Sequence, residues 1–216
     1  MFKAFYAAIY DRISSGSERA GLSEERRGLL AQAAGATIEI GAGTGANLAH
    51  YPSAVTRLCL VEPDPNMRKR LYRRAAGRQV EIVDASAEAL PFPDSSFDTA
   101  VVTFALCSVT DLDTALAEIA RVLRPGGRLL FLEHVRDTDP KIARKQDHPV
   151  FVYSWIGCHP NRDTLTAIRR APFEVTTVRH GEVPKAPQVE RPMIAGTAAR
   201  ADSGPGDVPE ERAGAA

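Results

Sequence analysis

The chain reads TIEIGAGTG at residues 37–45, an apolar, partly β-branched run that leads directly into closely spaced glycines. Ile38 and Ile40 favour a strand, and the glycines permit a tight turn that a ligand can approach closely. Asn47 and Leu48 follow in a short helical pattern, and a helix N-terminus offers free N–H groups. The stretch therefore predicts a strand–turn–helix unit that forms one wall of a binding pocket.

Strand and helix patterns alternate from residue 36 to residue 134, which is typical of βαβ units and a parallel sheet. The clearest helix is expected at residues 111–123, where apolar side chains recur at helical spacing and an Arg-Pro-Gly-Gly sequence follows. Its apolar stripe should pack on the sheet. The predicted strands are residues 36–40, 56–61, 79–83, 97–103 and 127–134.

Outside this region the patterns predict three further parts. Two N-terminal helices are expected within residues 1–35, because apolar side chains share one face before and after a Ser/Gly-rich break. Beyond residue 140 the signal weakens to one helix and two strands, and the last residues lack Leu, Ile and aromatic side chains. We expect a helix at 162–170, strands at 173–178 and 192–198, one domain over 36–198, and a disordered tail at 199–216.

Composition excludes several classes of protein. The chain has 216 residues, enough for one α/β domain, and its 27 basic and 27 acidic residues give a net charge of zero, which disfavours a general nucleic-acid binder. No apolar run is long enough to span a membrane, and no secretory signal is evident. The three cysteines lack a C-x-x-C spacing, so we expect no metal site, no disulfide framework and a reducing cytoplasmic location.

Acidic residues stand at the ends of three successive predicted strands, at Glu39, Glu62 and Asp84. The carboxyl ends of parallel strands meet at one edge of the sheet, where ligands bind. There Glu62 is placed to accept hydrogen bonds from two vicinal ribose hydroxyls, and Asp84 from an adenine amino group. The joint placement predicts an acidic rim that suits a cationic cofactor.

The glycine turn by itself also permits other interpretations. Gly41, Gly43 and Ala46 satisfy a dinucleotide fingerprint, but a short-chain dehydrogenase would need a Tyr-x-x-x-Lys pair, which the sequence lacks. The basic cluster at residues 68–74 could suggest RNA contact. We interpret it as a solvated helix face with Met67 and Leu71 turned inward.

The successive motifs resemble those of class I S-adenosylmethionine-dependent methyltransferases. They are E-x-G-x-G-x-G at Glu39, VEPD at 61–64, DA at 84–85, LPF at 90–92 and LRPGG at 123–127. The resemblance implies a Rossmann-like, three-layer α/β/α fold with a seven-stranded mixed sheet whose last strand is antiparallel. It also implies S-adenosylmethionine as cofactor, with contacts expected at Glu39, Gly41, Gly43, Gly45, Asn47, Glu62, Pro63, Met67, Asp84, Ala85 and Thr103.

Further segments are similar to a narrower branch, the methyltransferase type 11 group with its small-molecule and alkyl-thiol methyltransferases. These are YDR at 10–12, LCSV at 106–109, EHV at 133–135 and GCH at 157–159. The similarity implies methyl transfer to a small, rather apolar acceptor: a thiol, amine, phenol or lipid-like molecule. The candidates for a catalytic role are His134, Cys158, His159 and Asp11.

The N-terminal helix is expected to act as a lid over the cofactor, and its apolar face could also contact a membrane surface. We expect residues 153–162 to line the acceptor side. An alternative is a non-catalytic S-adenosylmethionine-binding or membrane-associated protein with a degenerate acceptor site. The oligomeric state stays open.

Overall fold

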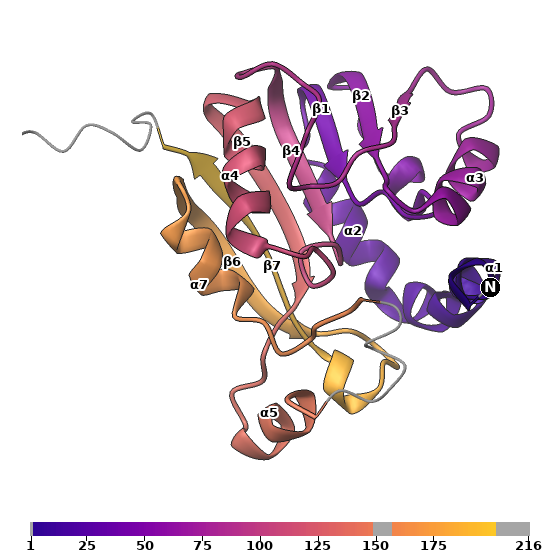
Figure 1. Ribbon diagram of the computed structural model, residues 1–216, viewed down its shortest axis with the longest axis vertical. Coiled ribbons are helices and arrows are strands. Elements are labelled where there is room, and N and C mark those ends of the chain that lie inside the picture. Colours follow the sequence, from indigo (N-terminus) through magenta and orange to yellow (C-terminus); the bar gives the residue numbers. More distant parts are fainter. Residues whose placement is uncertain (1, 149–156, 202–216) are drawn as a thin grey trace, which may run out of the picture.

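One mixed sheet runs through the protein, with the strand order β3-β2-β1-β4-β5-β7-β6 (Figure 1). The computed structural model describes residues 2–148 and 157–201. Neighbouring strands are parallel except for β7, which runs antiparallel to both β5 and β6. The predicted seven-stranded sheet with an antiparallel last strand is confirmed. The strands are β1 Gly35–Ile40, β2 Val55–Val61, β3 Glu81–Val83, β4 Phe97–Thr103, β5 Leu123–His134, β6 Phe173–Glu182 and β7 Pro192–Arg200.

The helices differ from the sequence prediction mainly at their ends. The predicted helix at 162–170 begins at Thr164, because Asp163 accepts a hydrogen bond from the Thr166 N–H and caps it. The expected N-terminal break is instead a bend at Gly21, whose φ is 129°. The helices in the described residues are α1 Phe2–Ser17, η1 Glu18–Leu22, α2 Ser23–Leu30, η2 Ala46–Ala49, α3 Pro65–Arg74, α4 Leu112–Val122, α5 Pro140–Gln146, α7 Thr164–Arg170 and η3 Gln188–Glu190.

Several strand boundaries were predicted incorrectly: β3 begins at Glu81 rather than residue 79, and β6 runs to Glu182 rather than residue 178. The fifth strand begins at Leu123 rather than residue 127, because Leu123 already pairs with Phe97 ahead of the Pro-Gly-Gly turn. The last strand runs to Arg200, beyond the expected end at 198, and Ala199 pairs with Arg128 and Glu174. Residues 202–216 of the predicted tail lie outside the described residues.

Both faces of the sheet are covered, which explains the nearly continuous apolar character of its central strands. On one face Ile38, Val102 and Phe131 pack with α4 and α7, and on the other Val101 and Leu130 pack with α2. Each fully buried side chain of this kind contributes about 1.5–3 kcal/mol to stability. The cluster on the second face includes Leu29 and Leu30 of α2 and Leu22 at the end of η1. Leu71 of α3 and the following Ala75 lie in a third cluster with Leu58 and Leu60 of β2. The three-layer arrangement is thus confirmed.

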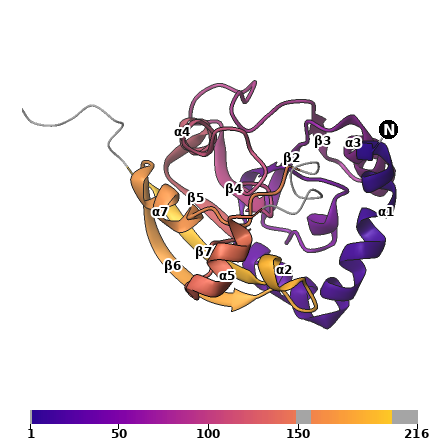
Figure 2. The same ribbon diagram turned by 60° about the horizontal axis from the view of Figure 1, so that its bottom comes forward.

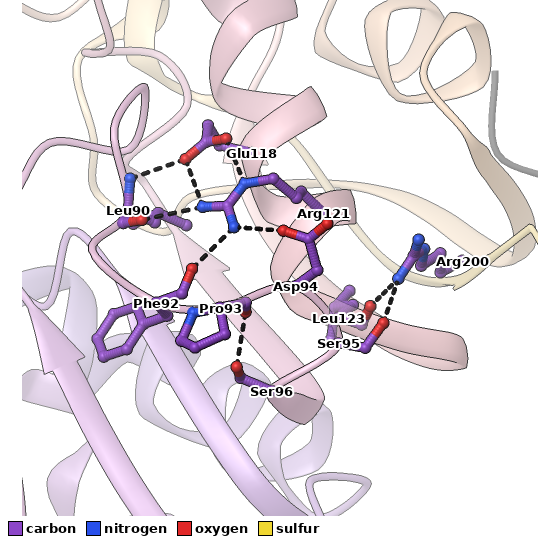
Figure 3. A network of polar contacts seen from close by, with 10 residues as sticks. All are labelled: Leu90, Phe92, Pro93, Asp94, Ser95, Ser96, Glu118, Arg121, Leu123 and Arg200. Carbon is purple, nitrogen blue, oxygen red and sulfur yellow. Dashed lines mark hydrogen bonds and ion pairs between the residues drawn. The ribbon is translucent and has the colours of Figure 1, made fainter.

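The connection between β3 and β4 is held by a single guanidinium group (Figure 3). Arg121 of α4 donates to the carbonyl oxygens of Leu90 and Phe92, at 2.9 and 2.7 Å, and pairs with Asp94. Glu118 on the same helix accepts from the Leu90 N–H at 2.9 Å. The LPF motif at 90–92 therefore has a structural role: its backbone bonds to α4 and so fixes the loop that begins at Asp84.

Helix α1 lies beside α3 in both views of the molecule (Figures 1 and 2). In Figure 1 the arrows of β4 and β5 point to the same lower edge where α1 and α5 lie. The N-terminal helices thus stand at the carboxyl end of the parallel strands, as a lid would. Among residues 2–148 and 157–201, the helices are too short or too polar to cross a membrane.

Candidate functional site

A cavity of about 610 Å³ opens at the carboxyl ends of β1, β2 and β4. Cavities of this size are typical of small-ligand sites. Its wall combines the glycine turn, the strand ends, the N-terminal helices and segments that follow β4, β5 and β6. The predicted site residues in this wall are Glu39, Gly41, Gly43, Asn47, Glu62, Pro63, Met67, Ala85, Thr103, His134 and Cys158.

Gly41 and Gly43 shape the turn after β1, and both have a positive φ. A Cβ at Gly41 would lie 2.5 Å from the Ala105 Cβ, so a side chain there would push two strand ends apart. A Cβ at Gly43 would meet no atom closer than 4.0 Å and would occupy the cavity instead. The glycines therefore bring the backbone together at one point and keep space open for a ligand at the next.

Glu62 is fixed at the end of β2 by the backbone around it. One carboxylate oxygen accepts the Gly43 N–H at 2.7 Å, and the other accepts the Asp64 N–H at 2.8 Å. The residue is 6% exposed, and burial raises its carboxyl pKa. A carboxylate has about four acceptor positions, so both oxygens retain capacity for a pair of hydroxyl donors.

Glu39 lies deeper, at the end of β1, and is 2% exposed. It accepts hydrogen bonds from Asn47 Nδ2 at 2.9 Å and from the Tyr51 hydroxyl at 2.7 Å. Burial raises its pKa to about 7. Glu39 and Glu62, together with the groups that bond to them, form what we call the acidic wall of the cavity.

Arg26 of α2 is also part of the acidic wall, although it was not among the predicted site residues. It is 4% exposed and donates to Asn47 Oδ1 at 3.0 Å and to Thr103 Oγ1 at 2.9 Å. Its Nε also pairs with Glu18 at 3.0 Å. The signal was available in the sequence: Arg26 stands four residues after Leu22 and shares that helix's apolar face.

Asp11 ties helix α1 to the glycine turn from outside the cavity. Its carboxylate accepts from the Thr44 hydroxyl at 2.6 Å and from Arg74 at 2.8 Å. This contact explains why α1 packs on α3. It makes Asp11 a structural link between the helix and the turn.

A second wall is aromatic. Tyr6 and Tyr10 of α1 meet edge to face with centroids 5.6 Å apart, and burial raises both phenol pKa values. Phe104, which follows β4, stacks at 4.5 Å on the imidazole of His134. These four residues, which all line the cavity, form what we call the aromatic wall.

His134 ends β5, and burial lowers its pKa to about 4, against the effect of a backbone hydrogen bond with Glu190. The imidazole is therefore neutral near pH 7. Its Nδ1 atom is buried and has no hydrogen-bond partner within the described residues. Within the described residues, the aromatic wall thus contains a buried polar atom whose hydrogen-bonding capacity is unused.

Two thiols and a buried carboxylate lie next to this wall. Cys107 and Cys158 both line the cavity, with their sulfur atoms 3.7 Å apart. The pKa of the Cys107 thiol is raised well above its usual value, because the hydrogen bond that it shares with Cys158 favours its protonated form and because it is buried. Glu133 accepts the N–H groups of Ala105 and Leu106 at 2.8 and 3.0 Å, and burial raises its pKa to about 7. Glu133 thereby shapes the loop that follows β4.

Several selected residues lie outside the cavity wall. Asp84 pairs with Arg68 at 2.5 Å and its side chain is 66% exposed. A Cβ at Gly45 would contact Leu48 and Leu71, so this glycine serves packing. His159 donates its backbone N–H to the Cys107 carbonyl. Residues 153–156 of the expected acceptor segment lie outside the described residues.

Comparisons with known proteins agree with this architecture. Residues 38–131 match the model of a methyltransferase domain family. Human thiol S-methyltransferase TMT1A is 33% identical over 171 residues, which cover 76% of this chain and 70% of the human protein. The C-methyltransferase UbiE of Hahella chejuensis is 50% identical over 88 residues, which cover 41% of this chain and 34% of that protein.

A solved structure is similar over most of the fold. Geranyl diphosphate methyltransferase in complex with S-adenosylmethionine superposes with a TM-score of 0.65 at 16% identity, covering 83% of this chain and 84% of that one. The cavity fits such a cofactor, since it joins a glycine turn without side chains to buried carboxylates that retain acceptor capacity. With these matches to domain, sequence and fold, the chain belongs to the S-adenosylmethionine-dependent methyltransferases.

Proposed function

We propose that this protein transfers the methyl group of S-adenosylmethionine to the sulfur atom of a small, apolar thiol. When bound, the cofactor supplies a methyl group on a positively charged sulfonium, which a nucleophile can displace directly. The remaining catalytic requirements are alignment, exclusion of water and an acceptor that is already nucleophilic. In this proposal, different parts of the cavity align the reactants, exclude water and bind the acceptor.

The acidic wall is proposed to hold the cofactor. Glu62 would accept hydrogen bonds from vicinal ribose hydroxyls, with Pro63, Met67 and Ala85 beside the adenine. Gly41 and Gly43 would lie along the methionine part together with Glu39. Asn47 and Thr103 would act through the hydrogen bonds that they share with Arg26.

The low pKa of His134 favours a thiol over a phenol or an amine as the methyl acceptor. An imidazole whose pKa is about 4 cannot take a proton from a phenol or an ammonium group, which ionise near pH 10. A thiolate is intrinsically very nucleophilic, so even the small fraction of a thiol that is ionised near neutral pH can react without a protein base. The neutral imidazole would then position the acceptor by contact with the ring, with Phe104, Tyr6 and Tyr10 covering its apolar part. The thiol specificity in the name of TMT1A supports the same acceptor.

The alternative catalytic candidates fit this role less well. Asp11 is occupied by Thr44 and Arg74, and His159 is not part of the cavity wall. Cys158 lines the wall, but a methyl acceptor within the protein would be consumed after one reaction. We therefore propose His134 as the acceptor-positioning residue and α1 as the lid that excludes water.

The test is methyl transfer to a matched set of acceptors. Purified protein is incubated with labelled S-adenosylmethionine and an alkanethiol, the alcohol and amine of the same chain length, and a phenol. We expect S-methylated product alone. Methylation of the amine or phenol at a comparable rate would overturn the proposal, as would the absence of transfer to every thiol while cofactor binding is intact.

The pH dependence sharpens this test. If the acceptor ionises without a protein base, the midpoint of the kcat/KM profile follows the pKa of the thiol. An arenethiol, which is more acidic, should therefore give a lower midpoint than an alkanethiol. A midpoint near pH 7 for both thiols would instead point to a carboxyl with a raised pKa, Glu39 or Glu133.

A further inference from the structure

Two thiols from distant parts of the chain meet in the cavity wall. Cys107 lies in the loop after β4 and Cys158 lies 51 residues later, yet their sulfur atoms are 3.7 Å apart. Cys107 is 1% exposed, whereas Cys158 is partly exposed. The third cysteine, Cys59, is fully buried in β2 and is not part of the wall.

Hydrogen bonds to backbone groups near Cys107 fix the segment that carries Cys158. The His159 N–H donates to the Cys107 carbonyl oxygen at 2.8 Å. Arg162 donates to the carbonyl oxygens of Leu106 and Val109, at 2.6 and 2.7 Å. The segment that carries Cys158 is thus attached to the chain on both sides of Cys107.

The two sulfur atoms, 3.7 Å apart, are in van der Waals contact. Sulfur atoms in a disulfide are about 2.05 Å apart, so these two must approach by roughly 1.7 Å, which is within the range of side-chain rotation. Cys107 has weak partners that compete for its sulfur, since it lies 3.6 Å from the Phe104 carbonyl and 3.5 Å from the Ser108 hydroxyl. Weak hydrogen bonds of this kind do not prevent rotation.

We propose that Cys107 and Cys158 form a reversible modification site, a dithiol that low-molecular-weight disulfides oxidise to an intramolecular disulfide. Cys158 reacts first, because it is the thiol that the cavity exposes to a small reagent. Its thiolate attacks one sulfur of the disulfide RSSR, forms a mixed disulfide with one RS group and releases the other as RS⁻. Cys107 cannot take this first role, because it is buried.

The second step resolves the mixed disulfide. The Cys107 sulfur attacks the Sγ of Cys158, the bond to the remaining RS group breaks, and the departing RS⁻ takes the proton that Cys107 loses. In total, the two protein thiols are oxidised to one disulfide and RSSR is reduced to two RSH molecules. A reducing thiol reverses both steps.

The disulfide would link the loop after β4 to the segment after residue 157, directly beside Phe104 and the aromatic wall. Methyl transfer would then respond to the oxidation state of the thiols around the protein. Oxidised low-molecular-weight thiols offer no free sulfur to methylate. As disulfides, they would also oxidise Cys107 and Cys158 and thereby link the two segments beside the aromatic wall. This consequence rests on the proposed thiol acceptor, whereas formation of the disulfide does not.

The test is disulfide mapping of the full chain. Protein is equilibrated with 2-hydroxyethyl disulfide and 2-mercaptoethanol at graded ratios, quenched with acid, alkylated and mapped by mass spectrometry. We expect a peptide that joins Cys107 to Cys158, while Cys59 stays alkylatable after unfolding. Excess 2-mercaptoethanol should remove the link. Affinity for S-adenosylhomocysteine, measured before and after oxidation, should change by less than threefold, because the acidic wall is not part of the link.

Two variants test the order of the steps. Cys107→Ser should stop at a mixed disulfide on Cys158, and Cys158→Ser should remain unmodified under the same conditions. A parent protein that retains only the mixed disulfide, that stays unmodified, or that links through Cys59 would overturn the proposal. Because every readout is a mass or a binding constant, the result stands whether or not the protein methylates thiols.

Discussion

The acidic wall and the aromatic wall of the cavity differ in how their polar atoms are satisfied. In the acidic wall, both carboxylate oxygens of Glu39 and of Glu62 accept hydrogen bonds, and Arg26 bridges three further groups. In the aromatic wall, His134 Nδ1 is buried without a partner in the described residues. The polar atoms of the first wall are satisfied by one another, whereas the second wall contains a buried polar atom without a partner in the described residues.

This difference indicates which of the two walls tolerates changes in its residues and shape more readily. A buried hydrogen-bonded network is costly to disturb, because removing one group leaves its partners unsatisfied. Apolar contacts around one free nitrogen accept changes of shape more readily. Binding of a common cofactor and choice of a variable acceptor would therefore reside in separate parts of the same cavity.

The largest effect is expected from Arg26→Met. The substitution removes the donor for Asn47, Thr103 and Glu18 while keeping most of the apolar volume. Loss of one member of a buried charged network costs about 3–5 kcal/mol, and Glu18 is partly solvated, so we expect about 3 kcal/mol in the free energy of unfolding. Urea denaturation measures this value.

The neighbouring Arg27→Met is the matched control. The Arg27 side chain is 67% exposed and pairs only at the surface with Glu24, so its removal should cost less than about 0.5 kcal/mol. Equal losses in the two variants would show that Arg26 has no special role in the acidic wall.

Glu62→Gln is expected to have the next largest effect, on cofactor affinity. The variant loses the charge that strengthens hydrogen bonds to ribose hydroxyls, and one of its two acceptor oxygens becomes a donor. Hydrogen bonds to charged groups contribute about 1.5–3 kcal/mol, and binding of S-adenosylhomocysteine by titration calorimetry should weaken accordingly. Glu81→Gln, on the exposed end of β3, should leave affinity unchanged.

Asp84→Asn tests whether a carboxylate outside the cavity wall contributes to cofactor affinity. Because Asp84 is mostly exposed and already paired with Arg68, its substitution should weaken the same binding by less than about 1 kcal/mol. A loss as large as that of Glu62→Gln would place the Asp84 carboxylate in direct contact with the cofactor.

The effect expected from His134 is on the pH dependence of stability, and it is close to zero at pH 7.5. Its pKa falls from 6.5 to about 4 on folding, so below pH 6.5 the unfolded chain binds the proton more readily and the native state loses stability. His134→Gln removes this loss. Relative to the parent, the variant should gain about 2 kcal/mol between pH 7.5 and pH 5.

Comparison with the parent isolates this effect. Glu39 and Glu133 have raised pKa values, so they favour the native state as the pH falls from 7 to 4.5, but they are the same in both proteins. The exposed His180 provides the matched control, His180→Gln. A parent and a His134 variant whose stability curves run parallel from pH 7.5 to pH 5 would contradict a buried neutral imidazole.

The sequence predicted the acidic wall better than the aromatic wall for a physical reason. Glu39, Glu62 and the glycines follow strands directly, and the carboxyl ends of parallel strands converge on one edge. Local order in the chain therefore sets their positions. Arg26 was missed because a charged residue on a helix is normally solvated, although its place on the apolar face of α2 was a signal for its burial.

The sequence by itself determined the alternating strands and helices, the glycine turn and the two strand-end carboxylates, because each depends on neighbours within a few residues. Only the tertiary structure decided that Asp84 faces Arg68, that the imidazole of His134 is buried and stacked on Phe104, and that Cys107 meets Cys158. These contacts join segments far apart in the chain. Burial and distance, which set both pKa and reactivity, arise only when those segments pack together.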